Sequence, residues 1–158
     1  LDSTFLSADS AGYEELAALV RDIHIGGFCA FGGVEPVPAV MLNGTYGATI
    51  LGQPLELAAI LNRLQRLSPL PLVVAGDFEH GVGMRINGAT RFPRAMAFGA
   101  TGDATLVRDA ARITAVESRA LGVHVNFAPV ADVNNNPRNP VINIRSFGED
   151  PAKVGVMV

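Results

Sequence analysis

Two apolar runs in this chain each end abruptly at an aspartate, and a long loop that carries an arginine follows each run. The first run ends at Asp77 and its loop reaches Arg85, while the second ends at Asp132 and its loop reaches Arg145. In parallel α/β folds, residues just beyond the carboxyl ends of neighbouring strands point into one shared site. The pattern therefore favours a parallel sheet and predicts that these four charged side chains lie close together.

Helix and strand signals alternate along the rest of the chain. Apolar residues at helical spacing, together with capping residues, predict helices between Ser10 and Gly26, at residues 54–67, at residues 103–121 and from Pro151 onward. Short, continuously apolar runs predict strands at residues 27–31, 72–76 and 123–127. Such runs are typical of a parallel sheet that is covered on both faces.

The lengths of the connections identify the type of α/β fold. Long segments follow the three predicted strands, at residues 32–53, 77–102 and 128–150, whereas the returns from helix to strand are short. This asymmetry is typical of a (β/α) TIM-type barrel, in which the loops after the strands carry the chemistry. A complete barrel needs about 250 residues. We therefore expect residues 1–158 to form a single domain that is a partial barrel, about its first half.

Composition excludes several classes of function. The chain is 49% hydrophobic and 17% charged with a net charge of −3, so it can form a core but has no basic cluster suited to nucleic acid. Its longest apolar runs are too short to span a membrane. The single cysteine, Cys29, excludes an intrachain disulfide and a cysteine-based zinc site, and its apolar neighbours predict a buried, inert thiol.

The charged residues after the strands allow several interpretations. Two pairs of Asp and Arg suit a polar, hydroxyl-rich ligand such as a sugar, because a planar guanidinium binds two neighbouring oxygens at once. Asp77 could instead cap the following turn, or join Glu79 and His80 in a metal cluster, although no second group of ligands is evident. Arg145 could instead form a surface ion pair with Glu149 or Asp150. We expect His24 and His124, which border predicted strands, to be structural.

Several long motifs resemble the N-terminal catalytic domain of glycoside hydrolase family 3. They cover about residues 25–155 and include GGFCAF, VVAGDFEHGVGMRI, ATRFPRAMAFGATGDATL, ESRALGVHVNFAPVADVN and NPVINIRSFGEDP. The forms NFAPVADVNNNP and RSFGEDP are more similar to the β-N-acetylhexosaminidase branch than to the β-glucosidase branch. The resemblance implies a barrel enzyme that needs no metal or other cofactor and acts on a carbohydrate substrate.

The resemblance also assigns roles to individual residues. It implies that Asp77 and Arg145 contact the reacting sugar, with Arg85 and Asp132 orienting them. His80 stands where this family's loop usually has glycine, so it belongs to the substrate-binding set but leaves fine substrate preference open. The family's Lys-His pair and its later aspartate nucleophile have no counterpart here, because the one lysine is Lys153. No catalytic residue is therefore assigned within the chain.

These observations predict a fragment of a retaining glycoside hydrolase that acts on β-linked terminal sugars, with N-acetylglucosamine favoured. The alternatives are a β-glucosidase of the same family, a sugar-binding homologue without hydrolytic activity, and an unrelated small α/β enzyme of complete length. We expect the isolated fragment to be inactive. Three parallel strands also leave open sheet edges, through which the fragment could associate with itself.

Overall fold

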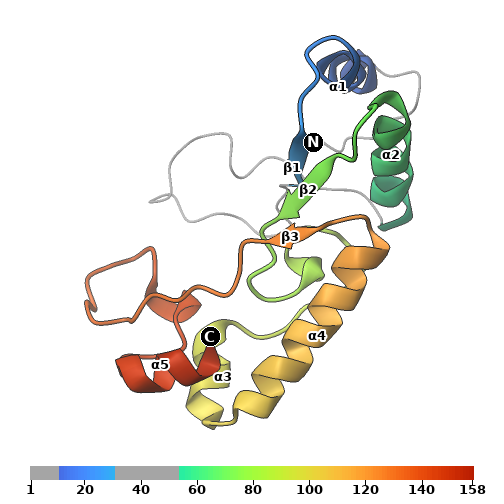
Figure 1. Ribbon diagram of the computed structural model, residues 1–158. Helices are drawn as coiled ribbons and strands as arrows, with labels where there is room; N and C mark the ends of the chain where they lie inside the picture. Colours follow the sequence, from blue (N-terminus) through green and yellow to red (C-terminus); the bar gives the residue numbers. More distant parts are fainter. Residues whose placement is uncertain (1–10, 31–53) are drawn as a thin grey trace.

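The computed structural model describes residues 11–30 and 54–158, and these residues form a parallel α/β assembly (Figure 1). Its elements follow in the order α1 (Ala11–Arg21), β1 (Gly27–Ala30), α2 (Pro54–Leu67), β2 (Val73–Gly76), η2 (Val82–Met84), α3 (Ala95–Thr101), α4 (Ala104–Ala120), β3 (Val125–Asn126), η3 (Asn143–Arg145) and α5 (Pro151–Met157). The predicted alternation of helix and strand is confirmed for these ranges. The Gly- and Pro-rich loop predicted at residues 32–53 lies outside the described residues.

The sheet has three parallel strands in the order β1-β2-β3. Gly27 of β1 pairs with Val73 of β2, and Ala75 of β2 pairs with Val125 of β3. Because every strand runs in the same direction, the loops that follow them leave from one edge of the sheet. This geometry confirms the predicted parallel arrangement and brings the loops after β2 and β3 together.

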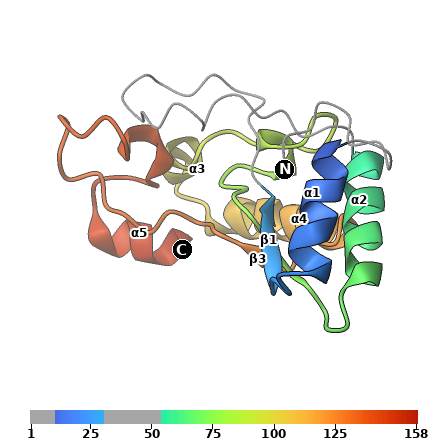
Figure 2. The same ribbon diagram turned by 90° about the horizontal axis from the view of Figure 1, so that it is seen from above.

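Helices cover one face of the sheet, as Figure 2 shows for the pair α1 and α2. The main core lies between the strands, α2 and the end of α4, and its buried members are Ala30, Leu57, Leu61, Val74, Phe78, Val82, Ile86, Leu121 and Val123. A second cluster joins α1 to α2 through Tyr13, Ala17, Val20, Ile60, Leu64 and Leu72. The apolar stripe predicted for α2 is thereby confirmed at Leu57, Ile60, Leu61 and Leu64.

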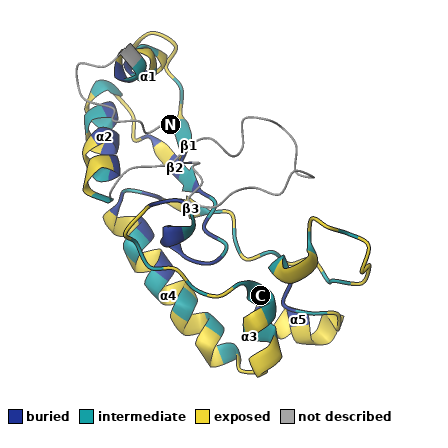
Figure 3. Ribbon diagram, turned by 180° about the vertical axis from the view of Figure 1, so that it is seen from behind, coloured by how far each residue is buried: buried dark blue, intermediate teal, exposed yellow. Residues whose placement is uncertain are grey.

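The other face of the sheet is open, so the prediction of a sheet covered on both faces is wrong for the described residues (Figure 3). Val73 is 54% exposed and Phe127, just after β3, is 60% exposed. In a complete barrel this face points inward and is filled by side chains from strands all around the ring. Three strands cannot supply those layers, and the apolar side chains on that face stay in contact with solvent.

The same open face overturns the prediction for Cys29, whose side chain is exposed rather than buried. Cys29 lies on β1 next to Ala30, which is fully buried, and successive side chains of a strand point to opposite faces. The pKa of the thiol is nevertheless raised, first by desolvation and then by the nearby Asp77 carboxylate. Both effects favour the protonated thiol over the reactive thiolate.

One helix boundary and one whole helix differ from the predictions. The first helix ends at Arg21, and Ile23, which was predicted to continue its apolar stripe, is exposed beyond the helix end. The second difference is α3, which lies inside a stretch predicted to be irregular. Its sequence, AMAFGAT, is rich in small residues and has no apolar stripe, and none of its residues is buried. The periodicity that identifies amphipathic helices is therefore missing.

The helices on either side of β3 begin as predicted. Asp103 caps α4 by accepting a hydrogen bond from the backbone N–H of Thr105 at 2.8 Å. Asp150 caps α5 by accepting from Ala152 and Lys153, and Pro151 occupies the first turn. No helix in the ranges 11–30 and 54–158 is both long enough and apolar enough to cross a membrane.

Candidate functional site

The loop after β2 carries two carboxylates within three residues, and the structure pairs each with an arginine. The Asp77 carboxylate accepts a hydrogen bond from Nη2 of Arg85, whose Nε also donates to the Asp77 carbonyl at 3.2 Å. The side chain of Arg85 is 9% exposed and that of Asp77 is 19% exposed. This buried pair holds Asp77 in place, which agrees with the orienting role expected for Arg85.

Asp77 does not act as the turn cap that the sequence also allowed. In the described part of the chain, its carboxylate is engaged by Arg85 and accepts no hydrogen bond from the backbone of the following turn. The turn is stabilised from elsewhere: the N–H of Phe78 donates to Oδ1 of Asn126, at the end of β3, over 3.0 Å. The loop after β2 is therefore tied directly to the neighbouring strand.

Arg145 reaches this loop from a position 66 residues further along the chain. Its Nε donates to both carboxylate oxygens of Glu79, at 3.1 Å and 2.9 Å, and its Nη2 donates to Oε1 at 2.5 Å. The surface ion pair with Glu149 or Asp150, considered from the sequence, is therefore wrong. From the sequence, Glu79 was considered only as a metal ligand. A half-buried arginine needs a carboxylate partner, and this requirement is the signal that could have pointed to Glu79.

The loops after β2 and β3 meet at the ion pair between Glu79 and Arg145. Its pKa is raised, chiefly by the hydrogen bonds to Glu79 and also by the negative charges of Asp77 and Asp132. Asp132 is exposed, and its backbone carbonyl accepts a 2.6 Å hydrogen bond from Oγ of the buried Ser146. The hydrogen bonds between Arg145 and Glu79 thus join the loop after β3 to the loop after β2 at the carboxyl edge of the sheet.

His80 lies deeper than the other predicted site residues. It is 4% exposed, and its backbone carbonyl accepts a 2.8 Å hydrogen bond from the N–H of Phe92. Burial lowers the pKa of its imidazole below the ordinary value of 6.5, and the positive charge of Arg94 lowers it further. Its part in substrate binding stays a prediction.

The other two histidines differ from each other. His124 joins β2 to β3: its N–H donates to the Val74 carbonyl at 2.7 Å, and its Nδ1 accepts from the Val74 N–H at 3.1 Å. The structural role predicted for His124 is thereby confirmed. His24 is exposed, with a backbone φ of 58°.

The second half of the Asp77 loop is attached to α4. Both carboxylate oxygens of Glu117 accept hydrogen bonds from Thr90, one from its backbone N–H at 3.1 Å and one from its hydroxyl at 2.5 Å. The Thr90 carbonyl in turn accepts from the N–H of Gly83 at 2.8 Å. A side chain on Gly83 would come within 2.5 Å of the Ala89 carbonyl oxygen, so this close approach requires glycine. No local sequence pattern marks this attachment.

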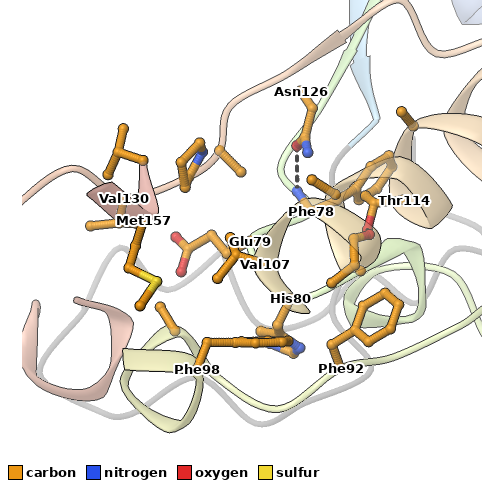
Figure 4. A pocket seen from close by; sticks show the side chains of 18 of the residues that line it. Phe78, Glu79, His80, Phe92, Phe98, Val107, Thr114, Asn126, Val130 and Met157 are labelled. Atoms are coloured by element: carbon orange, nitrogen blue, oxygen red, sulfur yellow. Dashed lines mark hydrogen bonds between the residues drawn. The ribbon is translucent and has the colours of Figure 1, made fainter. Parts of the chain in front are cut away.

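A cavity of about 470 Å³ lies beside the charged residues, between α4, α5 and the segment after β3. Figure 4 shows Glu79, His80 and Phe98 around it, with Val130 and Met157 nearby and the Asn126–Phe78 hydrogen bond drawn as a dashed line. Most of its walls are apolar, whereas the charged pair Asp77–Arg85 does not line it. Glu79, His80 and Arg145 also line the cavity, so it combines apolar walls with the charged Glu79–Arg145 pair.

A metal centre has no support in the described residues. Within residues 11–30 and 54–158, no group of three or more His, Cys, Asp and Glu side chains is arranged to hold a metal ion. Asp77 and Glu79, which were considered together with His80 as a metal cluster, are instead each paired with an arginine.

Comparisons with known proteins identify relatives over nearly the whole chain. The model of the glycosyl hydrolase family 3 N terminal domain matches residues 5–158. A β-N-acetylglucosaminidase/β-glucosidase from Cellulomonas fimi is 35% identical over 144 residues, which are 91% of this chain and 22% of that protein. Beta-hexosaminidase A from Pseudoalteromonas piscicida is 41% identical over 146 residues, which are 89% of this chain and 22% of that protein.

A solved structure agrees with these sequence matches. The family 3 β-N-acetylglucosaminidase from Paenibacillus sp. str. FPU-7 superposes with a TM-score of 0.75 at 35% identity, over 91% of this chain and 25% of that one. The chain thus spans about a quarter of the length of these three relatives. The three parallel strands and their helices correspond to part of that larger fold, which confirms the predicted partial barrel.

Proposed function

Since this chain belongs to glycosyl hydrolase family 3, we propose that the whole protein hydrolyses β-linked terminal sugars, with N-acetylglucosamine as the favoured unit. The observation that carries the proposal is the pair of ion pairs Asp77–Arg85 and Glu79–Arg145, which join the loops after β2 and β3 at the carboxyl edge of a parallel sheet. In (β/α) barrels this edge is where substrates bind. Membership in the family excludes the alternative of an unrelated small α/β enzyme.

Each charged group has a distinct part in the proposed site. Asp77 accepts hydrogen bonds from sugar hydroxyls, while Arg85 holds the Asp77 carboxylate in place. Arg145 donates to oxygens of the same sugar, and Asp132 adds negative charge near its guanidinium. Charge-assisted hydrogen bonds of this kind are about twice as strong as neutral ones, which makes them effective in recognising a polar ligand.

The chemical step needs residues beyond these four. Retaining hydrolysis uses a nucleophilic carboxylate and an acid/base group about 5 Å apart. Asp77 and Glu79 are each paired with an arginine, so neither carboxylate is free to act as the nucleophile. We therefore propose that the nucleophile is supplied by a part of the protein outside residues 1–158, and that this segment contributes part of the sugar subsite.

Names of the relatives support N-acetylglucosamine over glucose without excluding the latter. The Pseudoalteromonas relative is named a hexosaminidase, and the Cellulomonas relative carries both activities in its name. A β-glucosidase therefore stays as the second candidate. A sugar-binding homologue without turnover is a third candidate, because the described residues account for binding more directly than for bond cleavage.

Activity of the full-length protein on two chromogenic substrates tests the proposal. We expect a higher kcat/KM for the β-N-acetylglucosaminide than for the β-glucoside, with the anomeric configuration of the released sugar retained. The reverse preference would establish the β-glucosidase instead. Binding of the monosaccharide without any release of chromophore would identify the non-catalytic homologue, and an inverted product would contradict the retaining mechanism.

A further inference from the structure

Glu79 is the most completely engaged carboxylate of the site. Its side chain is 9% exposed, and both of its oxygens accept hydrogen bonds from Arg145. In the described residues, the hydrogen bonds of its carboxylate all go to Arg145. The contact through which Glu79 can affect the site is therefore the one with that arginine.

Arg145, in contrast, still has donors to offer. A guanidinium has five N–H groups. Arg145 uses its Nε–H and one Nη2–H on Glu79, and one Nη1–H on the Val141 carbonyl at 3.2 Å. One N–H on each terminal nitrogen therefore has no protein partner in the described part of the chain. The Arg145 side chain as a whole is 25% exposed, so it is not sealed off from solvent.

The contact with Glu79 also reduces the side-chain entropy that Arg145 loses when a ligand binds. An arginine side chain loses rotamer entropy when it becomes ordered. In this protein the bidentate contact with Glu79 orders the guanidinium before any ligand arrives. Binding energy that would otherwise be spent on ordering the side chain is then retained as affinity, which is the general benefit of preorganisation.

We propose that Glu79 is a positioning residue that orients Arg145, so that its two remaining donors bind a pair of neighbouring oxygens on the terminal sugar. This inference rests on the proposed function, because it takes the sugar as the ligand of Arg145. Vicinal hydroxyl groups of a pyranose present two acceptor oxygens at a spacing that one guanidinium can bridge. The role differs from that of Arg85, which orients the carboxylate Asp77.

Glu79→Gln in the full-length protein provides the first test. The amide keeps one acceptor oxygen but places an NH₂ group against a donor of Arg145, which disrupts the bidentate contact. We expect the Kd for free N-acetylglucosamine and the KM of its β-glycoside each to rise about 10- to 100-fold, with a smaller change in kcat, because the contact is made to the sugar and not to the breaking bond. If Glu79→Gln does not fold, Glu79→Asp, which keeps the negative charge, replaces it in the same measurements.

A double variant separates positioning from a merely structural role. If Glu79 acts through Arg145, then Glu79→Gln should weaken sugar binding little further once Arg145→Lys has removed the two-pronged guanidinium. The double variant should therefore bind the sugar about as weakly as Arg145→Lys alone. Independent effects that multiply in the double variant would overturn the proposal. A lowered melting temperature of Glu79→Gln with an unchanged Kd would overturn it as well.

Glu149→Gln is the matched control, since Glu149 is an exposed glutamate in the same segment as Arg145. It should change neither Kd nor KM, and a loss equal to that of Glu79→Gln would overturn the proposal. Measuring Kd as well as turnover also distinguishes the proposed function from the proposed role of Glu79. If the wild-type protein binds the monosaccharide but does not hydrolyse the glycoside, the proposed function fails while the effect on Kd still tests Glu79. A wild-type protein that binds neither N-acetylglucosamine nor glucose overturns both.

Discussion

At the residue scale, the site is built from carboxylates whose charges are already balanced by protein. Asp77 is paired with Arg85 and Glu79 with Arg145, and all four side chains are at most a quarter exposed. Breaking one member of such a buried pair costs about 3–5 kcal/mol, because a charge is left without its partner. Substitutions that keep the shape of the side chain are therefore the informative ones.

Asp77→Asn is expected to weaken sugar binding in the full-length protein. Asparagine keeps one acceptor oxygen for Arg85 but loses the negative charge that strengthens hydrogen bonds to sugar hydroxyls. Each such bond contributes about 1.5–3 kcal/mol, so we expect kcat/KM to fall by about one to two decades. Steady-state kinetics measure the change, with the exposed Asp109→Asn as the control. Unchanged kcat/KM in Asp77→Asn would show that Asp77 is no more than the partner of Arg85.

His80 should make stability depend on pH. Its folded-state pKa lies below the ordinary value of 6.5, because burial and the charge of Arg94 disfavour the imidazolium. Between these two pKa values the unfolded chain binds more protons than the folded one, so the free energy of unfolding rises with pH in this window. The stabilisation that comes from the neutral His80 is lost as pH falls below about 6.5. Urea unfolding of wild type and His80→Asn at a series of pH values measures the slope. An equally steep slope in His80→Asn would assign the dependence to other groups.

At the scale of elements, α3 is held against η3 by a close backbone contact. A Cβ atom on Gly99 would lie 1.7 Å from the Phe147 carbonyl oxygen, which is part of the segment that directly follows Arg145. The helix can approach this segment only because residue 99 has no side chain. Packing of α3 thereby influences where the segment carrying Arg145 lies.

Two glycine substitutions with opposite expected effects test this contact. Gly99→Ala should destabilise the protein by about 1–3 kcal/mol, because the new methyl group meets backbone atoms that cannot rotate away. Gly155→Ala on α5 is the matched control, since nothing lies within 4 Å of its added Cβ. There the change should stabilise by about 0.5–1 kcal/mol through helix propensity. Thermal unfolding measures both, and a neutral Gly99→Ala would contradict the close packing of α3.

At the scale of the whole molecule, the sheet is incomplete. In the described ranges, β1 and β3 each pair only with β2, so each has a free edge. The face opposite the helices exposes Val73, Val125 and Phe127. An edge with unpaired backbone groups beside an apolar face is a template for association with another chain.

Residues 1–158 expressed alone should therefore be inactive and should not behave as a monomer. Leaving a few hundred Å² of apolar surface exposed costs several kcal/mol at about 25 cal/mol per Å², comparable with the whole stability of a small domain. Light scattering measures the mass, and chromogenic β-N-acetylglucosaminide and β-glucoside measure turnover. A stable monomer that releases chromophore would overturn both the expected association and the placement of the nucleophile outside this segment.

The sequence by itself determined those features of the protein whose causes lie within a few residues of each other. Asp103 and Pro151 marked helix starts, the spacing of Leu57, Ile60, Leu61 and Leu64 marked the buried side of α2, and the apolar runs marked β2 and β3. Capping, periodicity and strand length are local properties, so they are readable without coordinates. The meeting of the loops after β2 and β3 was also readable, because parallel strands release their loops at one edge.

Only the tertiary structure decided which charged groups pair and which side chains are covered. Glu79 and Arg145 are 66 residues apart, and Glu117 and Thr90 are 27 apart, so neither contact has a local signature. The exposure of Cys29 likewise depends on what packs against the far face of the sheet, which its apolar neighbours in sequence do not reveal. Local patterns specify elements because their energies are local, whereas partner choice and burial depend on the arrangement of the whole fold.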